Sequence, residues 1–482
     1  MQKSRIYVVA ILIVIFLLFG FLLYYMQTTF DELTKTENEL LELRKSFEIM
    51  NNYMLNFSYD KYGGYTFIKG IRTGFFHIEK INGTFWLVDP DGNVFLSKGV
   101  NAVNYYGDYS PTLGYSPYNR IVSKKYGSPQ AWAKTTINRL RSWGFNTIGA
   151  WSSEELFSQG MPYTIILNFA AQAGANWQSG EVIDYFSEKF QNISDDIAKK
   201  VCLEKKDDPY LIGYFTDNEL RWSPDWRSQN HLFDDYFHLP PSAPGKKALV
   251  DYLRNKYKDI SILNKNWGTS FSSFDELLNV TEAPKNSKVD SDRLGFLEIV
   301  SRKYFQVVHD AIRKYDKNHL ILGCRYAFKP PDEALKGCIG YIDVVSINAY
   351  INPYSDDLNM VINNINQIYN ITSLPVMITE FSFKAMDSGL PNTKGAGVPV
   401  KTQSERAKYY EEYVKRILSE PFVVGYHWFE YTDEPAQGRF DGENSNYGLV
   451  NINDEPWVIL VERATSVNLS AEYVHHEFST KR

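Results

Sequence analysis

Short β-prone segments alternate with helical segments along most of this chain, and that alternation restricts its fold more than any other feature. The segment 129–143 is typical of the helical ones, with one apolar face and a glycine directly after its end. Strands that alternate with helices build parallel sheets covered by those helices, so the sequence predicts an α/β fold. The predicted strands are 95–101, 145–151, 163–168, 211–218, 320–325, 342–350, 375–380 and 423–428.

The number of strand–helix units indicates a closed barrel. Eight parallel strands followed by helices are the elements of a (β/α)8, or TIM, barrel. A doubly wound open sheet is the alternative, but no glycine-rich phosphate loop follows the first strand. We assign 57–92 to N-terminal β-hairpins, 93–465 to the barrel and 466–482 to a C-terminal tail, with a long insertion over 222–301.

The N-terminal end carries a long apolar segment. Residues 6–26 contain no charged side chain and are long enough to cross a bilayer as a helix. Lys3 and Arg5 precede this segment, which favours a cytoplasmic N-terminus. We therefore predict a cytoplasmic tip and transmembrane signal anchor over 1–26, a single-pass location in the cell membrane, and an extracytoplasmic position for the remaining chain. A cleaved signal peptide is the alternative, although 24–27 lacks the small residues of a cleavage site.

A helical stalk is predicted over 27–56. Leu33, Leu40, Phe47 and Met54 recur every seven residues, as in the seam of a coiled coil. This stalk would hold the domain away from the membrane and allow a homo-oligomer to form; a helix packed on the domain is the alternative. An extracytoplasmic position also agrees with a glycoprotein. N-glycosylation sequons occur at Asn56, Asn82, Asn192, Asn279, Asn370 and Asn468.

Composition excludes some functions and leaves others open. The net charge of −6 argues against a nucleic-acid partner. The aromatic fraction of 15% suits stacking on sugar rings, but aromatic side chains also fill protein cores. Three cysteines, Cys202, Cys324 and Cys338, form neither a disulfide framework nor a metal-binding pattern. A Cys324–Cys338 bridge is one reading, and buried free thiols are the other.

Two predicted strands end in glutamates. The stretch 214–220 (YFTDNEL) places Glu219 after the fourth strand, and 375–381 (PVMITEF) places Glu380 at the end of the seventh. In a closed barrel both carboxylates can reach the cleft at the C-terminal face, where catalytic groups of this fold lie. Facing carboxylates are the groups that glycosidic hydrolysis needs. The alternative is that both cap helices, with Asp217 or Asn218 as the cap after the fourth strand.

These motifs carry a family resemblance. Together with other stretches, Asn218-Glu219 and Glu380 resemble the large clan of retaining TIM-barrel glycoside hydrolases, and within it the β-agarase-like and β-galactosidase-like branch. The other stretches are 86–92 (WLVDPDG), 97–101 (SKGVN), 402–407 (TQSERA), 425–429 (GYHWF), 441–444 (DGEN), 447–450 (YGLV), 253–257 (LRNKY) and 263–269 (LNKNWGT). The resemblance spans about 75–457. The sequence departs from this branch in two ways: the carbohydrate-binding module of many agarases and the cysteine cluster of many β-galactosidases are missing. Because the cysteine cluster is missing, we expect no zinc. We also expect no other metal and no cofactor.

The resemblance implies roles for individual residues. Glu219 would be the acid/base and Glu380 the nucleophile, and their carboxyl groups should lie about 5–5.5 Å apart if the enzyme is retaining. Asn218 would bind the sugar 2-hydroxyl, and Trp428 would form an aromatic floor, with a core tryptophan as its alternative. The other expected site residues are Arg325 as a cation beside Glu380, Asn348 or Tyr350 as its hydrogen-bond donors, and Asn101, Trp151, Glu430 and Arg439 in the cleft wall. His427 is expected to be structural.

The resemblance implies a glycosidase that cleaves β-linked sugars by a two-glutamate retaining mechanism, with a galactose-containing poly- or oligosaccharide as its partner. An exo-acting β-galactosidase-type enzyme is the alternative within the clan. A non-catalytic glycan-binding barrel is the alternative outside enzymes. The specificity of such barrels is decided by the loops after the strands, which the sequence does not rank.

Overall fold

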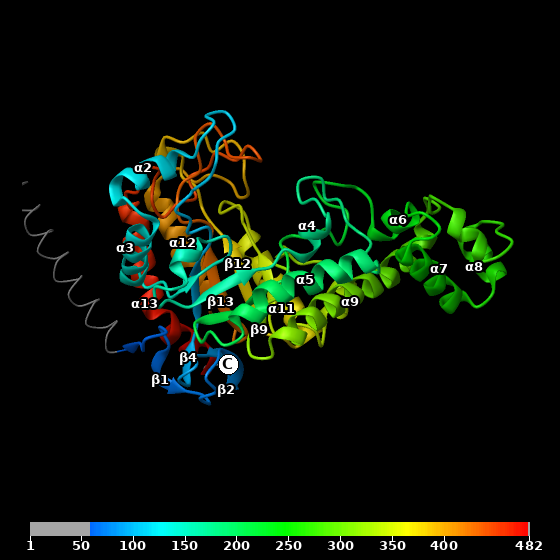
Figure 1. Cartoon of the computed structure of the whole chain (residues 1–482), viewed down its shortest axis with the longest axis horizontal. Helices are drawn as coiled ribbons and strands as arrows, with labels where there is room; N and C mark the ends of the chain where they lie inside the picture. Colours follow the sequence, from blue (N-terminus) through cyan, green and yellow to red (C-terminus); the bar gives the residue numbers. More distant parts are fainter. Residues whose placement is uncertain (1–57, 481–482) are drawn as a thin grey trace, which may run out of the picture. The chain divides into compact units, whose positions relative to one another are not determined.

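The computed structural model describes residues 58–480, and a parallel sheet of nine strands lies at their centre (Figure 1). The order of the strands is β10-β11-β12-β13-β5-β6-β7-β8-β9. Most of their side chains are buried, as in parallel sheets covered on both faces. The strands are β5 (Ser97–Val100), β6 (Thr147–Ile148), β7 (Tyr163–Ile166), β8 (Leu211–Phe215), β9 (Leu320–Ile321), β10 (Tyr326–Ala327), β11 (Val345–Asn348), β12 (Val376–Phe381) and β13 (Val423–Trp428).

The sheet curls back on itself. β13 pairs in parallel with β5, and the strands at the two ends of the order, β9 and β10, are successive parts of segment 320–327. Leu322 N donates to Tyr214 O of β8 at 2.8 Å, and Phe328 N donates to Asn348 O of β11 at 3.0 Å. One chain segment thus bonds to both neighbours, and the arrangement fits the predicted (β/α)8 barrel.

Helices cover the outer face of the sheet, and their ends follow from local sequence. α3 begins at Pro129, where Ser128 accepts a hydrogen bond from Ala131 N, and it confirms the helix predicted from residue 129. Thr402 caps α12 in the same way through Glu405 N. The covering helices are α3 (Pro129–Ser142), α5 (Glu188–Lys205), α9 (Asp290–Tyr315), α10 (Asp332–Cys338), α11 (Asp357–Thr372), α12 (Gln403–Ile417) and α13 (Val458–Thr480).

A small antiparallel sheet closes the N-terminal end of the barrel. It has the order β1-β4-β3-β2, and β2 pairs with β3 across a turn at Asn82-Gly83, within the segment predicted as β-hairpins. Phe76 and Leu87 from this sheet region pack in one cluster with barrel residues such as Ile212 and Met377. The opposite end of the barrel, where the strands end, is therefore the end left for a site. The four strands are β1 (Tyr65–Lys69), β2 (His77–Ile81), β3 (Thr84–Val88) and β4 (Asn93–Phe95).

The predicted insertion after the fourth barrel strand forms a helical lobe. Its helices α6, α7 and α8 lie around the N-terminal part of α9, away from the strands (Figure 1). The lobe contains α6 (Leu232–Phe237), α7 (Pro244–Tyr257), α8 (Ile260–Trp267), η2 (Asp275–Asn279) and η3 (Ser287–Val289). The remaining elements are α2 (Pro117–Tyr126), η1 (Glu154–Leu156), α4 (Phe169–Ala173) and η4 (Met386–Ser388).

The predicted C-terminal tail is helical in its described part. α13 runs without interruption past residue 465, where the sequence analysis ended the barrel. Glu472 on this helix forms a buried ion pair of 2.7 Å with Lys98 of β5. α13 therefore belongs to the barrel assembly through a contact with its first strand.

The membrane element of the predicted fold class is corrected. The anchor over 1–26 and the stalk over 27–56 lie outside the described residues. The predicted homo-oligomer depended on the stalk, so the described residues do not test it. Across 58–480, no helix combines the length and the apolar character that a bilayer crossing requires. We therefore do not retain the transmembrane helix in the fold class or the cell membrane as the location.

Side-chain burial decides two further predictions. Cys202, Cys324 and Cys338 are buried free thiols, so the Cys324–Cys338 bridge is excluded. Asn468 is fully buried, and its side chain bonds to Trp143 O, Tyr410 and Tyr426, so this sequon is closed to a glycan in the folded protein. The glycoprotein prediction has no support.

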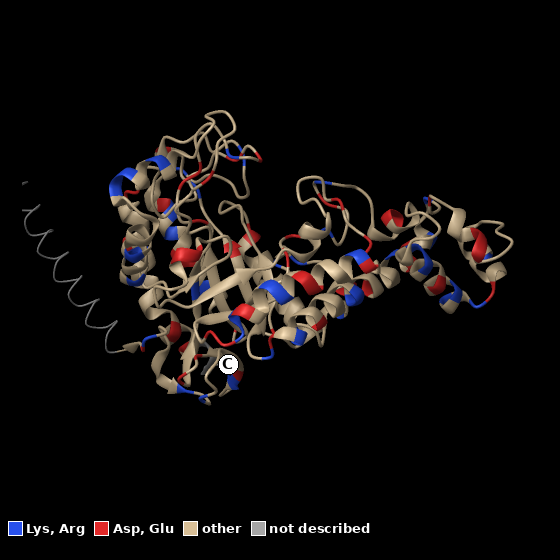
Figure 2. Ribbon diagram, viewed as in Figure 1, with Lys and Arg blue, Asp and Glu red and all other residues tan. Residues whose placement is uncertain are grey.

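Basic and acidic positions are interspersed on the outer helices in Figure 2.

Candidate active site

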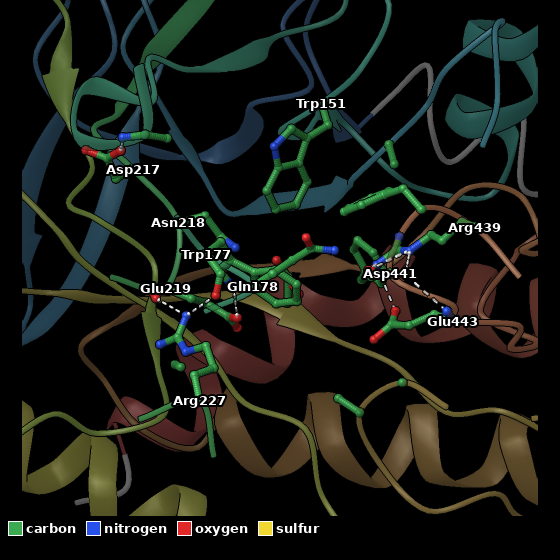
Figure 3. A pocket seen from close by; sticks show the side chains of 18 of the residues that line it. Trp151, Trp177, Gln178, Asp217, Asn218, Glu219, Arg227, Arg439, Asp441 and Glu443 are labelled. Atoms are coloured by element: carbon green, nitrogen blue, oxygen red, sulfur yellow. Dashed lines mark hydrogen bonds and ion pairs between the residues drawn. The ribbon is translucent and has the colours of Figure 1, made fainter. Parts of the chain in front are cut away.

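The two predicted glutamates line one cavity at the C-terminal end of the barrel. Figure 3 shows Glu219 among the residues that line it. Its volume is about 920 Å³. Glu219 follows β8, and its backbone N donates to Arg325 O at 3.1 Å, which extends strand pairing beyond β8. Glu380 is part of β12. Each carboxylate thus has its position set by the barrel sheet or its direct continuation.

The Glu380 carboxylate is buried and held by two donors. Arg325 Nη2 lies 2.8 Å from its Oε1, and Tyr350 Oη donates to its Oε2 at 2.6 Å. Arg325 was expected beside Glu380 as a cation, and Tyr350 was one of the two donors that the resemblance implied. Burial nevertheless raises the pKa of Glu380 to about 7; Arg325 and the Tyr350 hydrogen bond oppose this rise, and the charge of Glu219 adds to it.

The Glu219 carboxylate has a different pair of donors. Trp177 Nε1 donates to its Oε2 at 2.9 Å, and Asn348 Nδ2 donates to its Oε1 at 2.9 Å. Thr379 Oγ1 donates to Asn348 Oδ1 at 2.8 Å, which orients that amide. Asn348 or Tyr350 was expected as the donor to Glu380; Tyr350 makes that contact, whereas the Asn348 amide nitrogen donates to Glu219 and Asn218.

A loop clamp beside Glu219 was missed by the sequence analysis. Arg227 Nη1 donates to Glu219 O at 2.8 Å and to Trp177 O at 3.2 Å. Asp225 holds this guanidinium through an ion pair of 2.6 Å. Trp177 and Arg227 lie in irregular loops, where neither strand nor helix periodicity marks a residue as important. The only signal in the sequence was the residue types themselves, a cation at Arg227 and an aromatic side chain at Trp177.

Asp217 is structural, but it bonds to the first turn of α4, which precedes β8 in the chain, and not to a helix after the fourth strand as the alternative had it. Its carboxylate is fully buried and accepts hydrogen bonds from Ala170 N at 3.0 Å and from Ala171 N at 3.2 Å. These residues belong to the first turn of α4, and Tyr304 Oη donates to the same carboxylate at 2.7 Å. Burial raises the pKa of Asp217 to about 7. Asp217 therefore anchors α4, from which the chain continues to Trp177.

Two predicted site residues, Trp428 and Asn101, neither line the cavity nor bond to the Glu219 or Glu380 carboxylate. Trp428 is fully buried, donates through Nε1 to Tyr447 O at 2.9 Å, and packs edge-on against Phe381. Side chains alternate between the two faces of a strand, and Trp428 falls on the face toward the helices. Asn101 is also buried and ties strand ends together through Thr379 O and Ala150 N. The predicted aromatic floor and the predicted wall contact are therefore corrected to core contacts.

Aromatic lining comes instead from Trp151 and Phe429. Both line the cavity, with ring centroids 6.3 Å apart in an edge-on arrangement. The Arg325 guanidinium lies 4.2 Å from the Trp151 ring centroid, so the same cation contacts Trp151 and Glu380. His427 is structural as expected: Ser97 Oγ lies 2.8 Å from its Nε2, and burial lowers its pKa to about 3.

The cavity wall opposite Glu219 contains several acidic side chains that surround a single arginine, Arg439. Figure 3 places Trp177, Glu219 and Arg227 on one side and Arg439, Asp441 and Glu443 on the other. Arg439 forms ion pairs with Asp441 at 3.0 Å and Glu443 at 2.7 Å. Glu430 lines the same cavity, and burial raises its pKa well above the usual range. Both Glu430 and Arg439 therefore lie at the cleft wall, as predicted.

Replacing Tyr350 with phenylalanine should move the acid limb of the activity profile to higher pH. Tyr350 donates a hydrogen bond to the Glu380 carboxylate, which favours the ionised form, so its loss raises the pKa of Glu380 further above 7. A hydrogen bond to a charged group contributes about 1.5–3 kcal/mol, which corresponds to a displacement of roughly one pH unit or more. The measurement is kcat/KM against pH for wild type and Tyr350→Phe. A variant whose acid limb stays in place would show that Glu380 does not control it.

Comparisons with known proteins agree with this geometry. A family model described as beta-galactosidase matches residues 168–385, and one described as glycosyl hydrolase catalytic core matches residues 329–457. The chain is 31% identical to beta-agarase B of Vibrio sp. (strain JT0107), in an alignment that covers 84% of this chain and 49% of that protein. It is 27% identical to beta-agarase A of the same organism, over 80% of this chain and 44% of that one. The chain therefore spans about half the length of the curated relatives it matches.

Solved structures show the same similarity. An agarase, AgWH50C, superimposes with a TM-score of 0.76 at 27% identity and covers 90% of this chain and 70% of its own. An exo-beta-agarase superimposes with a TM-score of 0.77 at 25% identity and covers 87% of this chain and 67% of its own.

Proposed function

We propose that the chain is a TIM-barrel glycoside hydrolase that cleaves β-glycosidic bonds in galactose-containing poly- or oligosaccharides of the agarose type by a retaining mechanism. One observation carries the mechanism. Glu219 and Glu380 line the same cavity from the ends of the fourth and seventh barrel strands, and each carboxylate has its own pair of hydrogen-bond donors.

The two donor sets suit two different roles. Glu380 receives a guanidinium and a phenol, which stabilise negative charge on a nucleophile between turnovers. Glu219 receives two neutral N–H donors, from Trp177 and Asn348, and within residues 58–480 no cation bonds directly to its carboxylate. We assign Glu380 as nucleophile and Glu219 as acid/base on this difference.

The reaction then runs in two balanced steps. Glu380 attacks the anomeric carbon, and the bond from that carbon to the glycosidic oxygen breaks while Glu219 gives its proton to that oxygen. In the second step a water oxygen bonds to the anomeric carbon, the bond from that carbon to the Glu380 oxygen breaks, and the water proton moves to Glu219. Asn218 lies beside Glu219, and its Oδ1 accepts from Asn348 Nδ2 at 3.1 Å. This contact leaves the Asn218 amide nitrogen as the group for the sugar 2-hydroxyl.

The substrate class rests on the relatives and on the lining of the cavity. The relatives are agarases by name, and Trp151 and Phe429 offer aromatic faces beside the two carboxylates. The β-galactosidase family model favours a second candidate, an exo-acting β-galactosidase-type enzyme. Agarose and its oligosaccharides should be hydrolysed by the purified full chain faster than aryl β-galactosides. The reverse preference would favour the second candidate.

The first sugar product should appear in the β configuration. Each of the two displacements inverts the anomeric carbon, so their sequence restores the starting configuration. Proton NMR of the freshly formed reducing end distinguishes the β from the α anomer before mutarotation mixes them. An initial α product would indicate a single displacement by water, with carboxyl groups roughly 6.5–9.5 Å apart, and would exclude the roles given above.

A further inference from the structure

We propose that Trp226 is the platform for the sugar on the leaving-group side of the scissile bond. This inference rests on the proposed retaining mechanism and names a binding site within the same cavity. Trp226 lines the cavity, yet 64% of its surface is exposed. A tryptophan that is this exposed and still borders a cavity offers a flat apolar face to a ligand.

The ring of Trp226 is held from behind. The guanidinium of Arg227 lies 4.4 Å from the ring centroid and covers one face. Arg227 is itself fixed by Asp225 through an ion pair of 2.6 Å and is almost fully buried. The stack therefore leaves one face of Trp226 for a ligand and reduces the side-chain entropy that binding would otherwise cost.

The same arginine connects this platform to the acid/base. Arg227 Nη1 donates to Glu219 O and to Trp177 O, while Trp177 Nε1 donates to the Glu219 carboxylate. Trp226, Arg227, Trp177 and Glu219 thus form one connected group. The side chains of Arg325 and Tyr350 instead donate to the carboxylate of Glu380, the nucleophile.

The chemistry of the acid/base decides which sugar the platform serves. The carboxyl of Glu219 must reach the glycosidic oxygen, and that oxygen departs with the leaving sugar. A surface attached to the backbone of Glu219 therefore borders the leaving sugar, whereas the sugar attacked by Glu380 lies deeper, at the nucleophile. A neutral pyranose unit presents axial C–H groups on one face, which is the chemistry that an indole ring accepts.

The test separates the two sides of the scissile bond. In the wild-type full chain, 2-deoxy-2-fluoro-β-galactosyl fluoride should leave a fluorinated galactosyl ester on Glu380 and release fluoride, without any leaving sugar. Reactivation by an acceptor, a short oligosaccharide from agarose, then reports the leaving-group site. The acceptor hydroxyl oxygen bonds to the anomeric carbon, the bond from that carbon to the Glu380 oxygen breaks, and the hydroxyl proton moves to Glu219.

For Trp226→Ala, the ratio of acceptor-dependent to water-dependent reactivation should fall by about 10–100-fold, because an apolar contact the size of an indole face is lost. Trp226→Phe retains a ring and should recover most of the ratio. Tyr473→Ala is the matched control, since Tyr473 is a 59% exposed aromatic on α13 that does not line the cavity. Thermal melting of each variant checks the fold.

Two results would overturn the assignment. One is an unchanged acceptor dependence in Trp226→Ala; the other is a loss in the formation of the ester as large as the loss in acceptor reactivation, which would place Trp226 on the nucleophile side. If the wild type forms no ester with the fluoride and cleaves no agarose oligosaccharide, the proposed function itself fails, and the platform with it.

Discussion

Glu380→Ala should lose activity by about 10⁵–10⁶-fold on both sugar and activated aryl leaving groups, the scale seen when a catalytic nucleophile is removed. No other carboxylate can form the ester with the anomeric carbon in the first step of the proposed mechanism. Steady-state kinetics on agarose oligosaccharides and on an aryl β-galactoside provide the measurement. A variant that keeps substantial activity on either substrate would show that Glu380 is not the nucleophile.

The same variant removes a buried charge partner, so its fold needs a control. Arg325 would be left buried without its carboxylate, and breaking a buried pair costs about 3–5 kcal/mol. Glu380→Gln keeps the shape and should show the same loss of activity with a smaller change in Tm. Glu412→Ala, which removes an exposed glutamate on α12, should change neither. In Glu380→Ala, azide should attack the aryl β-galactoside directly and give an α-galactosyl azide.

Glu219→Ala should lose about 10²–10⁴-fold on sugar leaving groups and much less on an activated aryl glycoside. A sugar oxygen needs the proton that Glu219 supplies, whereas an acidic phenol departs without it. The difference between the two substrates is the signature, and it is measured as the ratio of their kcat/KM values in variant and wild type. Equal losses on both substrates would mean that Glu219 does more than transfer protons.

The configuration of the galactosyl azide product should distinguish the role of Glu219 from that of Glu380. In Glu219→Ala the ester on Glu380 still forms, and azide attacks it to give a β-galactosyl azide. The opposite configuration from the two variants would confirm that one glutamate makes the bond and the other moves the proton. Identical configurations from both would contradict the separate roles.

Much of the fold could be predicted because its signals are local. The hairpin of β2 and β3, the helix that begins at Pro129 and the buried apolar runs of the strands each depend on a few neighbouring residues. Closure of the sheet was harder, since segment 320–327 is split into two short strands that serve different neighbours. Only the pairing of distant strands shows that both belong to one barrel position.

The site residues also separate into those that local sequence indicates and those that only the tertiary structure places. Glu219 and Glu380 were found because a polar residue that ends a buried strand is costly unless it faces a partner or a cleft. Trp428 was assigned to the wrong face, because the sequence shows the strand but not which of its alternating side chains faces the barrel centre. The choice between Asn348 and Tyr350 as the donor to Glu380 stayed open for a similar reason: two glutamates lie within reach of this strand end, and only the tertiary structure decides which residue meets which.

Sequence by itself determined the alternation of strands and helices, and with it the two strand ends at which Glu219 and Glu380 lie. Tertiary structure alone decided which loops lie next to those strand ends. Trp177 donates a hydrogen bond to the Glu219 carboxylate, and Arg227 bonds to the backbone carbonyl of Glu219 while it stacks on the Trp226 ring. The physical reason is range. A strand and its end are encoded by contacts between near neighbours in the chain, whereas a loop position is set by hydrogen bonds and ion pairs that exist only after the barrel has brought distant segments together.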